Sequence, residues 1–199
     1  MLAAGRGERF GGDKLLAPLG GRPLLAHTLG AVRSALRAGA PARGCVVVAA
    51  DRPALAALAR DAGLEPVTNP DPASGLGDSL ACAARWLDDV HARGGPAAAV
   101  IFLGDQPRVR PDVVKALVSA WRAGSPYVRP RYAEEPDAPG HPALVDRAVW
   151  PIAARLAGDQ GLGPALGARG VHPAIVEVPG RNPDVDTPAD LVQLEGSSS

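Results

Sequence analysis

The sequence lacks the features of proteins that bind nucleic acids or membranes. Aromatic residues make up only 4% of its 199 residues, and 21 lysines and arginines are balanced by 21 acidic residues. A neutral chain has no excess positive charge to attract a nucleic-acid backbone or an anionic lipid surface. So few aromatic side chains also disfavour a platform for base stacking. We therefore expect no nucleic-acid or membrane partner, and a phosphate-bearing ligand must be held by a local cluster.

Cysteine and long hydrophobic runs are scarce as well. The chain has only Cys45 and Cys82, neither of them in a C-x-x-C motif or at ligand spacing from a histidine. We expect neither a disulfide nor a zinc site, but two free, buried thiols. No run is long enough to cross a membrane, and no basic segment with a hydrophobic stretch behind it opens the chain. These absences predict a cytoplasmic protein.

Strand-like and helix-like segments alternate over the first two thirds of the chain. The run at 97–103 is the most apolar, and because it lacks alternation we expect a central strand covered on both faces. Only Met1–Ala4 precede the first glycine, so we expect either a short first strand or a sequence that begins late. The next helix is expected to begin with Pro23 at its first position. Periodicity predicts further strands at 45–50 and 64–68, and helices at 23–36, 53–62, 78–92 and 111–123.

The last third of the chain is less regular. Strands are predicted at 127–129, 143–145 and 174–178, and helices at 148–156 and 188–194. Alternation of strands and helices is typical of an α/β protein, a three-layer αβα, Rossmann-like fold with a mostly parallel sheet. We expect an antiparallel strand in the C-terminal third. The prediction is one domain over residues 1–195, followed by a flexible tail at 196–199.

The first loop combines glycines with positive charge. Leu2–Leu16 holds four glycines and the three cations Arg6, Arg9 and Lys14, directly after the first predicted strand. Glycines let backbone N–H groups approach an anion, and successive amides can form a concave nest for it. Arg9 and Lys14 supply the charge that a triphosphate needs in a neutral protein. The alternative interpretation is a flexible surface loop.

Two other glycine signatures fail on this loop. A P-loop needs G-x-x-x-x-G-K-[ST], but Asp13 separates Gly12 from Lys14 and Leu15 follows the lysine. A dinucleotide fingerprint needs G-x-G-x-x-G at the start of a helix, but the third glycine, Gly11, comes one position late. Neither a P-loop nor a dinucleotide site is therefore predicted.

Carboxylates mark two further sites. Asp105, in Gly104-Asp105-Gln106-Pro107, follows the most apolar run, and ligands of open α/β sheets bind beyond the carboxyl ends of strands. Such a carboxylate suits Mg²⁺, although a cap on the turn before Pro107 also explains it. Thr187, followed by Pro188, has the pattern of a helix N-cap. That cap does not explain Asp184 and Asp186, which alternate on one face of a short extended segment.

A second glycine-bearing loop, Pro72–Leu80, enters a predicted helix whose N-terminus has unsatisfied N–H donors. Asp78 or Ser79 capping this helix is an equally good explanation. A lone histidine, His141 in Gly140-His141-Pro142, is more often structural than catalytic.

These motifs, in this order, resemble the MobA-like NTP transferases. The opening loop reads L-A-A-G-x-G-x-R-F-G-x-x-K-L-L, and G-L-G-D-S-L, G-D-Q-P, G-H-P-A-L, G-D-Q-G and D-V-D-T-P-A-D-L follow it. The matches reach from Leu2 to Leu191. Within the family the sequence looks most like the molybdenum cofactor cytidylyltransferases. The resemblance implies a nucleotidyltransferase fold.

The resemblance also implies roles for individual residues. Asp105 is implied as a ligand of Mg²⁺, with Asp186 favoured over Asp184 as the second ligand. Catalytic roles fall to Arg9, Lys14 and Asp105, and acceptor contacts to His141 and Asp159, although Asp159 fits a plain turn equally well. The implied nucleotide-binding residues are Ala3, Ala4, Gly5, Arg6, Gly7, Lys14, Gly75, Gly77 and Ser79.

The implied reaction transfers CMP from CTP to the phosphate of a molybdenum-pterin and releases pyrophosphate. An acceptor phosphate is already anionic, so the protein needs to position the substrates and neutralise charge rather than supply a base. CTP is favoured because guanylyltransferase relatives carry L-A-G-G where this chain has L-A-A-G. The implied partners are an NTP, a phosphorylated pterin and a molybdoenzyme that receives the product. The alternatives are another NTP or acceptor, a non-catalytic cofactor chaperone, or a nicotine blue-type NAD(P)H oxidoreductase.

Overall fold

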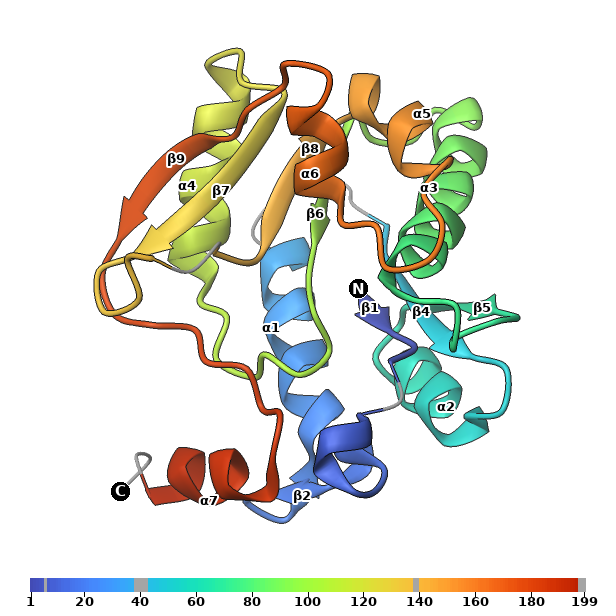
Figure 1. Ribbon diagram of the computed structural model, residues 1–199, viewed down its shortest axis with the longest axis vertical. Coiled ribbons are helices and arrows are strands. Elements are labelled where there is room, and N and C mark those ends of the chain that lie inside the picture. Colours follow the sequence, from blue (N-terminus) through green and yellow to red (C-terminus); the bar gives the residue numbers. More distant parts are fainter. Residues whose placement is uncertain (6, 38–42, 138–139, 197–199) are drawn as a thin grey trace.

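The computed structural model describes residues 1–5, 7–37, 43–137 and 140–196. Two groups of strands are joined by a parallel bridge between Leu2 and Leu103 (Figure 1). The resulting order across the molecule is β5-β4-β1-β6-β8-β7-β9. These strands are β1 (Leu2–Ala3), β4 (Cys45–Ala49), β5 (Glu65–Asn69), β6 (Ala98–Ile101), β7 (Tyr127–Tyr132), β8 (Ala143–Asp146) and β9 (Ala174–Val178).

The sheet is parallel except at one strand. β1 pairs with β4, β4 with β5 and β7 with β9 in parallel, whereas β8 runs antiparallel to both β6 and β7. This confirms the expected antiparallel strand in the C-terminal third. A small hairpin, β2 (Pro18–Leu19) with β3 (Arg22–Pro23), lies outside the main sheet.

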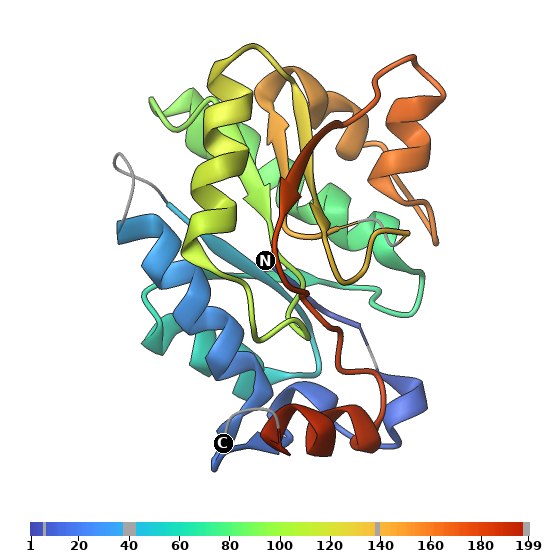
Figure 2. The same ribbon diagram turned by 90° about the vertical axis from the view of Figure 1, so that its left-hand side faces the viewer.

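Helices cover both faces of the sheet, which confirms the three-layer αβα architecture (Figure 2). One layer holds α1 (Leu24–Arg37), α2 (Pro53–Asp61) and α4 (Pro111–Arg122), and the other holds α3 (Leu76–Ala92), α5 (Trp150–Ala153) and α6 (Leu162–Gly167). Among the helices of the described residues, none is long and apolar enough to cross a membrane. Three 3₁₀ turns, η1 (Glu8–Phe10), η2 (Lys14–Leu16) and η3 (Arg147–Val149), and the closing helix α7 (Pro188–Gly196) complete the fold.

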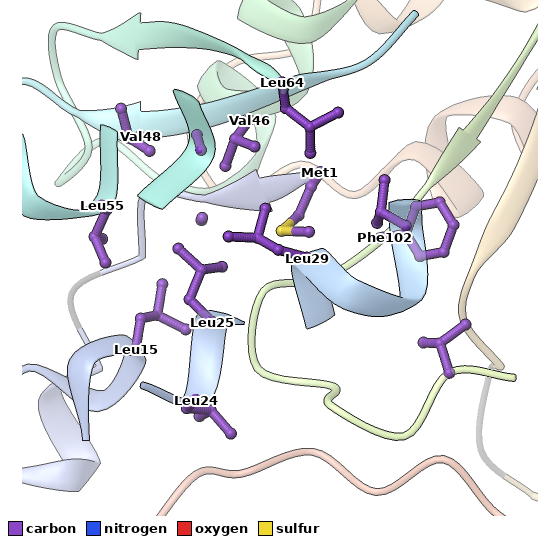
Figure 3. Close-up of a cluster of buried hydrophobic side chains, with 14 of the residues drawn as sticks. Met1, Leu15, Leu24, Leu25, Leu29, Val46, Val48, Leu55, Leu64 and Phe102 are labelled. Atoms are coloured by element: carbon purple, nitrogen blue, oxygen red, sulfur yellow. The ribbon is translucent and has the colours of Figure 1, made fainter. Parts of the chain in front are cut away.

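The core on the α1 side is built from alternate residues of the strands. Figure 3 shows Leu25 and Leu29 of α1 packed toward Met1 and Val46, with Phe102 beside them. Val46 and Leu25 are fully buried. Burying one such leucine stabilises the fold by about 1.5–3 kcal/mol, so truncating Leu25 to alanine would cost roughly 2–5 kcal/mol. Both cysteines are free and buried, as expected.

Several element boundaries differ from the sequence prediction. Pro23 does not begin α1 but ends the hairpin, whose turn uses Gly20 and Gly21 at φ +54° and +76°. α3 begins at Leu76, earlier than expected, because the chain turns into the helix at Gly75. The predicted helix at 148–156 is a 3₁₀ turn followed by the four-residue α5, and α6 was not predicted. Residues 197–199 of the expected tail lie outside the described residues.

The most apolar run is less covered than expected. All four residues of β6, Ala98–Ile101, are half-buried rather than buried. β8 pairs with β6 along one side, but on the other side β1 reaches only as far as Phe102 and Gly104. β1 is as short as predicted, with two residues, and this leaves the β4-facing side of β6 without a strand in the described part of the chain.

Candidate functional site

Three charged side chains meet at the carboxyl end of the sheet. Lys14 lies on η2, Asp105 follows β6, and Asp186 precedes α7. The Lys14 Nζ is 2.8 Å from Asp105 Oδ2 and 3.2 Å from Asp186 Oδ1. The structure therefore brings together, from distant parts of the chain, the predicted catalytic lysine and both predicted metal ligands.

The three charges of this cluster interact strongly because they lie close together and are partly buried. The Lys14 side chain is 11% exposed, against 24% for Asp105 and 35% for Asp186. Burial alone lowers the pKa of Lys14, but hydrogen bonds and charges from the two carboxylates outweigh it and raise the pKa above its usual value. Arg9 adds a second cation, with Nη1 3.0 Å from Asp186 Oδ2, on a side chain that is 76% exposed.

Backbone contacts fix the position of Asp105. The Gly104 amide donates to the Leu2 carbonyl at 2.9 Å, and the Thr28 hydroxyl donates to the Gly104 carbonyl at 2.9 Å. The Asp105 carboxylate makes no hydrogen bond to the turn before Pro107, and its buried Oδ1 has no partner among the described atoms. The turn-cap interpretation of Asp105 thus finds no support, and one buried carboxylate oxygen is left without a hydrogen bond.

Asp186 is held by the start of α7. The Asp190 carboxylate accepts hydrogen bonds from the amides of Asp186 and Thr187, and the Asp190 amide donates to the Thr187 hydroxyl. These bonds lower the pKa of Asp190. Thr187 is therefore an N-cap, as predicted, but the sequence analysis missed Asp190. The T-x-x-D spacing of a capping box is the signal that identifies it.

The Asp184 carboxylate has a different hydrogen-bond partner from that of Asp186. Its Oδ1 accepts a 2.5 Å hydrogen bond from Nε2 of Gln106, a buried residue that the sequence analysis did not single out. The Val185 amide donates to the Asp105 carbonyl at 3.1 Å, which ties the two carboxylate loops together. Because Asp186 and not Asp184 shares Lys14 with Asp105, the geometry favours Asp186 as the partner of Asp105.

The chemistry of this cluster suits a hard divalent cation. Mg²⁺ takes oxygen ligands and is commonly held by one or two carboxylates together with substrate phosphates. Asp105 and Asp186 provide such a pair, and the buried Asp105 Oδ1 has no hydrogen-bond partner among the described atoms. No group of three or more metal-ligating side chains occurs among the described residues. A cation here would therefore need phosphate or water oxygens to complete its coordination.

The first glycine loop surrounds Lys14. Ala3 and Ala4 are buried at the end of β1, and Gly5 is exposed. Gly7 has φ +63°, and a Cβ there would lie 3.1 Å from the Lys14 Cβ, so glycine allows the close approach of loop and lysine. The predicted contact residue Arg6 lies outside the described residues.

The second glycine loop packs against another loop. The Gly77 amide donates to the Gly158 carbonyl at 2.7 Å, and the Gly158 amide donates to Asp78 Oδ2 at 2.8 Å. A Cβ at Gly75 would come within 2.5 Å of Asp159 Oδ1, and one at Gly77 within 2.8 Å of the Ala157 backbone. Glycine is therefore needed at both positions so that this loop can pack against the loop at 157–159. Asp159 lies beside the predicted nucleotide loop.

Ser79 is buried and engaged within the protein. Its hydroxyl accepts a 3.0 Å hydrogen bond from the side-chain amide of Asn69, which ends β5 and is also buried. The Asn69 Oδ1 in turn accepts from the Asp71 amide. This chain of bonds fixes the loop between β5 and α3, and Asn69 is a further residue that the sequence analysis did not select.

His141 lies just before β8, whose first residue pairs with the last residue of β6. Burial is the main cause that lowers its pKa to about 4, with the charge of Arg129 as the next, so the imidazole is neutral near pH 7. Its Nδ1 is buried without a partner among the described atoms. Its carbonyl accepts hydrogen bonds from the Tyr132 hydroxyl and the Asn182 side chain. The His141 side chain therefore carries no positive charge near pH 7, and its contact with the acceptor stays a prediction.

Comparison with known proteins agrees with this geometry. A sequence model of the MobA-like NTP transferase domain matches residues 1–173. The 3-deoxy-manno-octulosonate cytidylyltransferase of Anaeromyxobacter dehalogenans is 39% identical over 119 residues. That match covers 59% of this chain but only 43% of the relative's length.

Solved structures match over nearly the whole chain. Rv0371c from Mycobacterium tuberculosis H37Rv is 31% identical, with a TM-score of 0.77, over 98% of this chain and 95% of that one. The structure of Rv0371c in complex with manganese is 29% identical, with a TM-score of 0.77, over 98% and 96% of the two chains.

Proposed function

Because this chain belongs to the family defined by the MobA-like NTP transferase domain, we propose that it is a metal-dependent nucleotidyltransferase that joins an NMP unit to a phosphorylated acceptor. The observation that carries the proposal is the position of Lys14 between Asp105 and Asp186. Two carboxylates and a partly buried lysine at the carboxyl end of a parallel sheet are groups that suit a metal–triphosphate complex.

In the proposed reaction, an oxygen of the acceptor phosphate forms a bond to the α-phosphorus of the NTP. The bond between the α-phosphorus and the bridging oxygen breaks, and pyrophosphate leaves. Lys14 and Arg9 would balance the charge of the triphosphate and the departing pyrophosphate. A divalent cation held by Asp105 and Asp186 would supply further charge neutralisation at the phosphates.

No side chain of the site needs to act as a general base, since the acceptor phosphate is already an anion. His141, the one histidine assigned to the acceptor side, has a pKa lowered to about 4 and is a neutral hydrogen-bonding group near pH 7. Gly5, Gly7 and Gly75 would hold the nucleotide through backbone amides, whereas the Gly77 amide is already bonded to the Gly158 carbonyl.

We propose further that the protein transfers CMP from CTP to a molybdenum-pterin, that its metal is Mg²⁺, and that it acts in the cytoplasm. Ala4 of the L-A-A-G motif supports CTP, and the relative from Anaeromyxobacter dehalogenans is itself named a cytidylyltransferase. The manganese in the Rv0371c complex supports a divalent cation. The pterin is supported by the sequence resemblance, and a molybdoenzyme would then receive the product.

One assay tests these assignments together. The protein is incubated with CTP, GTP, ATP or UTP, with Mg²⁺ or Mn²⁺, and with molybdopterin, and pyrophosphate release is measured. We expect release only with CTP, molybdopterin and a divalent cation present together. Release with another NTP would overturn the nucleotide assignment.

A parallel series tests the acceptor and the other classes of protein. In it 3-deoxy-manno-octulosonate replaces molybdopterin, because the named relative acts on that sugar acid. Release with the sugar acid alone would overturn the pterin assignment. Tight molybdopterin binding without any turnover would identify a carrier, and NAD(P)H consumption would identify an oxidoreductase.

A further inference from the structure

The acceptor side of the site needs a positive charge of its own. Lys14 and Arg9 both lie against Asp186, where they would serve the triphosphate, and His141 is neutral near pH 7. In the proposed reaction the acceptor phosphate has to approach a triphosphate closely, and two anions at such a distance repel each other. A cation beside His141 would offset this repulsion.

Arg129 lies on the face of β7 that is turned away from α4. Side chains alternate along a strand, and Val128 packs against Leu117 of α4, whereas Tyr127 packs on the side of α3 and α6. Figure 2 shows α4 and α6 on opposite sides of β7 and β9. Arg129 therefore shares the face of Tyr127. Ile175 of β9, which pairs with Arg129, is 41% exposed, so this face is open to solvent here.

The same part of the sheet leads from Arg129 to the carboxylate cluster. β8 pairs with β6 on one side and with β7 on the other, so two strand spacings of about 4.8 Å separate β7 from β6. Ile101 pairs with Ala143, and continuing the register of β7 with β8 places Arg129 opposite Ala143. Asp105 follows Ile101 toward the carboxyl end of the sheet. An acceptor phosphate at Arg129 and a metal-bound triphosphate at Asp105 would together span a separation of this order.

Backbone contacts hold the Arg129 guanidinium in place. Its Nε donates to the Gly140 carbonyl at 2.8 Å. A Cβ at Gly140 would overlap the Pro130 carbonyl, so only glycine lets this segment lie so close to β7. The carbonyl of the next residue, His141, accepts two further hydrogen bonds that fix the segment. A guanidinium has five N–H donors, so the bond through Nε leaves donors on both terminal nitrogens.

Arg129 forms no ion pair with a carboxylate in the described part of the chain. Arg131, two residues later on the same face, is paired instead with Glu177 at 3.1 Å. The charge of Arg129 acts on neutral neighbours, since it lowers the pKa of His141 and opposes the rise that burial causes in the pKa of Tyr127. A half-buried arginine without an acidic partner is suited to an anionic ligand.

We propose that Arg129 binds the phosphate of the acceptor substrate, an inference that rests on the proposed function. A planar guanidinium can donate to two oxygens of one phosphate at once, and this orients the third oxygen for attack on the α-phosphorus. The preferred acceptors are then phosphate monoesters, and compounds that lack a phosphate bind weakly. Arg131 has no such role because Glu177 already neutralises it.

Binding of inorganic phosphate tests this subsite without a transfer reaction. Arg129→Gln removes the charge, and Arg131→Gln is the matched control on the same face of the same strand. Isothermal titration calorimetry of the whole chain, at neutral pH, constant ionic strength and without metal, gives the phosphate affinity. Both substitutions are also made in Lys14→Met, because the triphosphate side can bind phosphate as well. We expect Arg129→Gln to weaken phosphate binding at least about tenfold in both backgrounds, and Arg131→Gln less than about twofold.

Two further measurements separate binding from folding. Arg129→Lys keeps the charge without the planar fork, so it should bind phosphate more tightly than Arg129→Gln and less tightly than the wild type. In the transfer assay, Arg129→Gln should raise the KM of the acceptor at least about tenfold and leave the KM of the NTP within about twofold.

The outcomes distinguish this inference from the proposed function. Equal phosphate affinities of Arg129→Gln and Arg131→Gln, in a protein that still transfers nucleotide, would overturn the role of Arg129 and leave the proposed function standing. Equal affinities of Arg129→Lys and Arg129→Gln would also count against a charged contact. Phosphate binding that depends on Arg129, in a protein that transfers to no acceptor, would support the anion subsite and overturn the proposed function.

Discussion

Replacing Lys14 with methionine tests the central ion-pair cluster. Lys14→Met keeps most of the side-chain volume but removes the charge that separates Asp105 from Asp186. The cluster lies between a buried and a surface ion pair, so we expect the substitution to lower the free energy of unfolding by about 1–3 kcal/mol without metal. Pyrophosphate release should fall at least about a hundredfold, because the triphosphate loses its best-placed cation.

Magnesium should act differently on the variant and on the wild type. A ligand at one hundred times its Kd stabilises a protein by about 2.7 kcal/mol. In the wild type, Mg²⁺ has to displace Lys14 from the carboxylates, so part of this gain is lost. In Lys14→Met the two carboxylates have no competing cation from Lys14, so Mg²⁺ should raise the free energy of unfolding by more than in the wild type.

Urea unfolding with and without MgCl₂ measures this difference directly. Lys115, the only other lysine, lies exposed on α4, so Lys115→Met serves as the matched control and should behave as the wild type. The raised pKa of Lys14 also predicts how the free energy of unfolding depends on pH. The stabilisation by the charged lysine is present at neutral pH and is lost as the pH rises through the raised pKa. An equal magnesium effect on both proteins, or normal turnover of Lys14→Met, would refute this account.

Three further predictions follow from the same structure. Asp105→Asn should reduce Mg²⁺-dependent pyrophosphate release at least about a hundredfold, and a wild-type rate would remove Asp105 from the metal site. Gly77→Ala places a Cβ within 2.8 Å of the Ala157 backbone and should cost about 1–3 kcal/mol in urea unfolding. Gly30→Ala, exposed in α1 with open space around it, is the control and should be neutral or stabilising. The pKa of His141 is lowered to about 4, so up to about 3 kcal/mol of stability should vanish as the pH falls from about 6.5 to 4. A variant, His141→Asn, that shows the same pH dependence would contradict this assignment.

The sequence was sufficient for the layers of the fold and for the main charged groups of the site. Strand–helix alternation predicted the αβα architecture because helices over a parallel sheet have a clear periodicity. Asp105 could be found because it follows an apolar run, and the carboxyl ends of parallel strands meet at one edge. Lys14 and Asp186 needed the family pattern as well, because nothing local indicates that positions so far apart converge.

One of the parts that were missed has a local signal, and the others depend on contacts between distant segments. Gly20 and Gly21 form a two-residue hairpin turn, a local signal that was present between Leu19 and Arg22 but not used. The contact of Gly77 with Gly158 has no such signal, because neither loop carries information about the other. The half-buried state of β6 was also unforeseen, since apolarity alone predicts full coverage and says nothing about the length of the neighbouring strand.

The position of Asp186 along the chain has a consequence for local unfolding. Asp186 lies between β9, which ends at Val178, and α7, which begins at Pro188, and belongs to neither. Opening of the chain after β9 would therefore remove the second carboxylate and leave the sheet intact, with Lys14 still beside Asp105. The ion pair with Lys14 would keep the charge of Asp105 neutralised in that open state. The carboxylate pair exists only while this segment is closed, so the ability to hold a metal would be lost at a lower free energy than the fold itself.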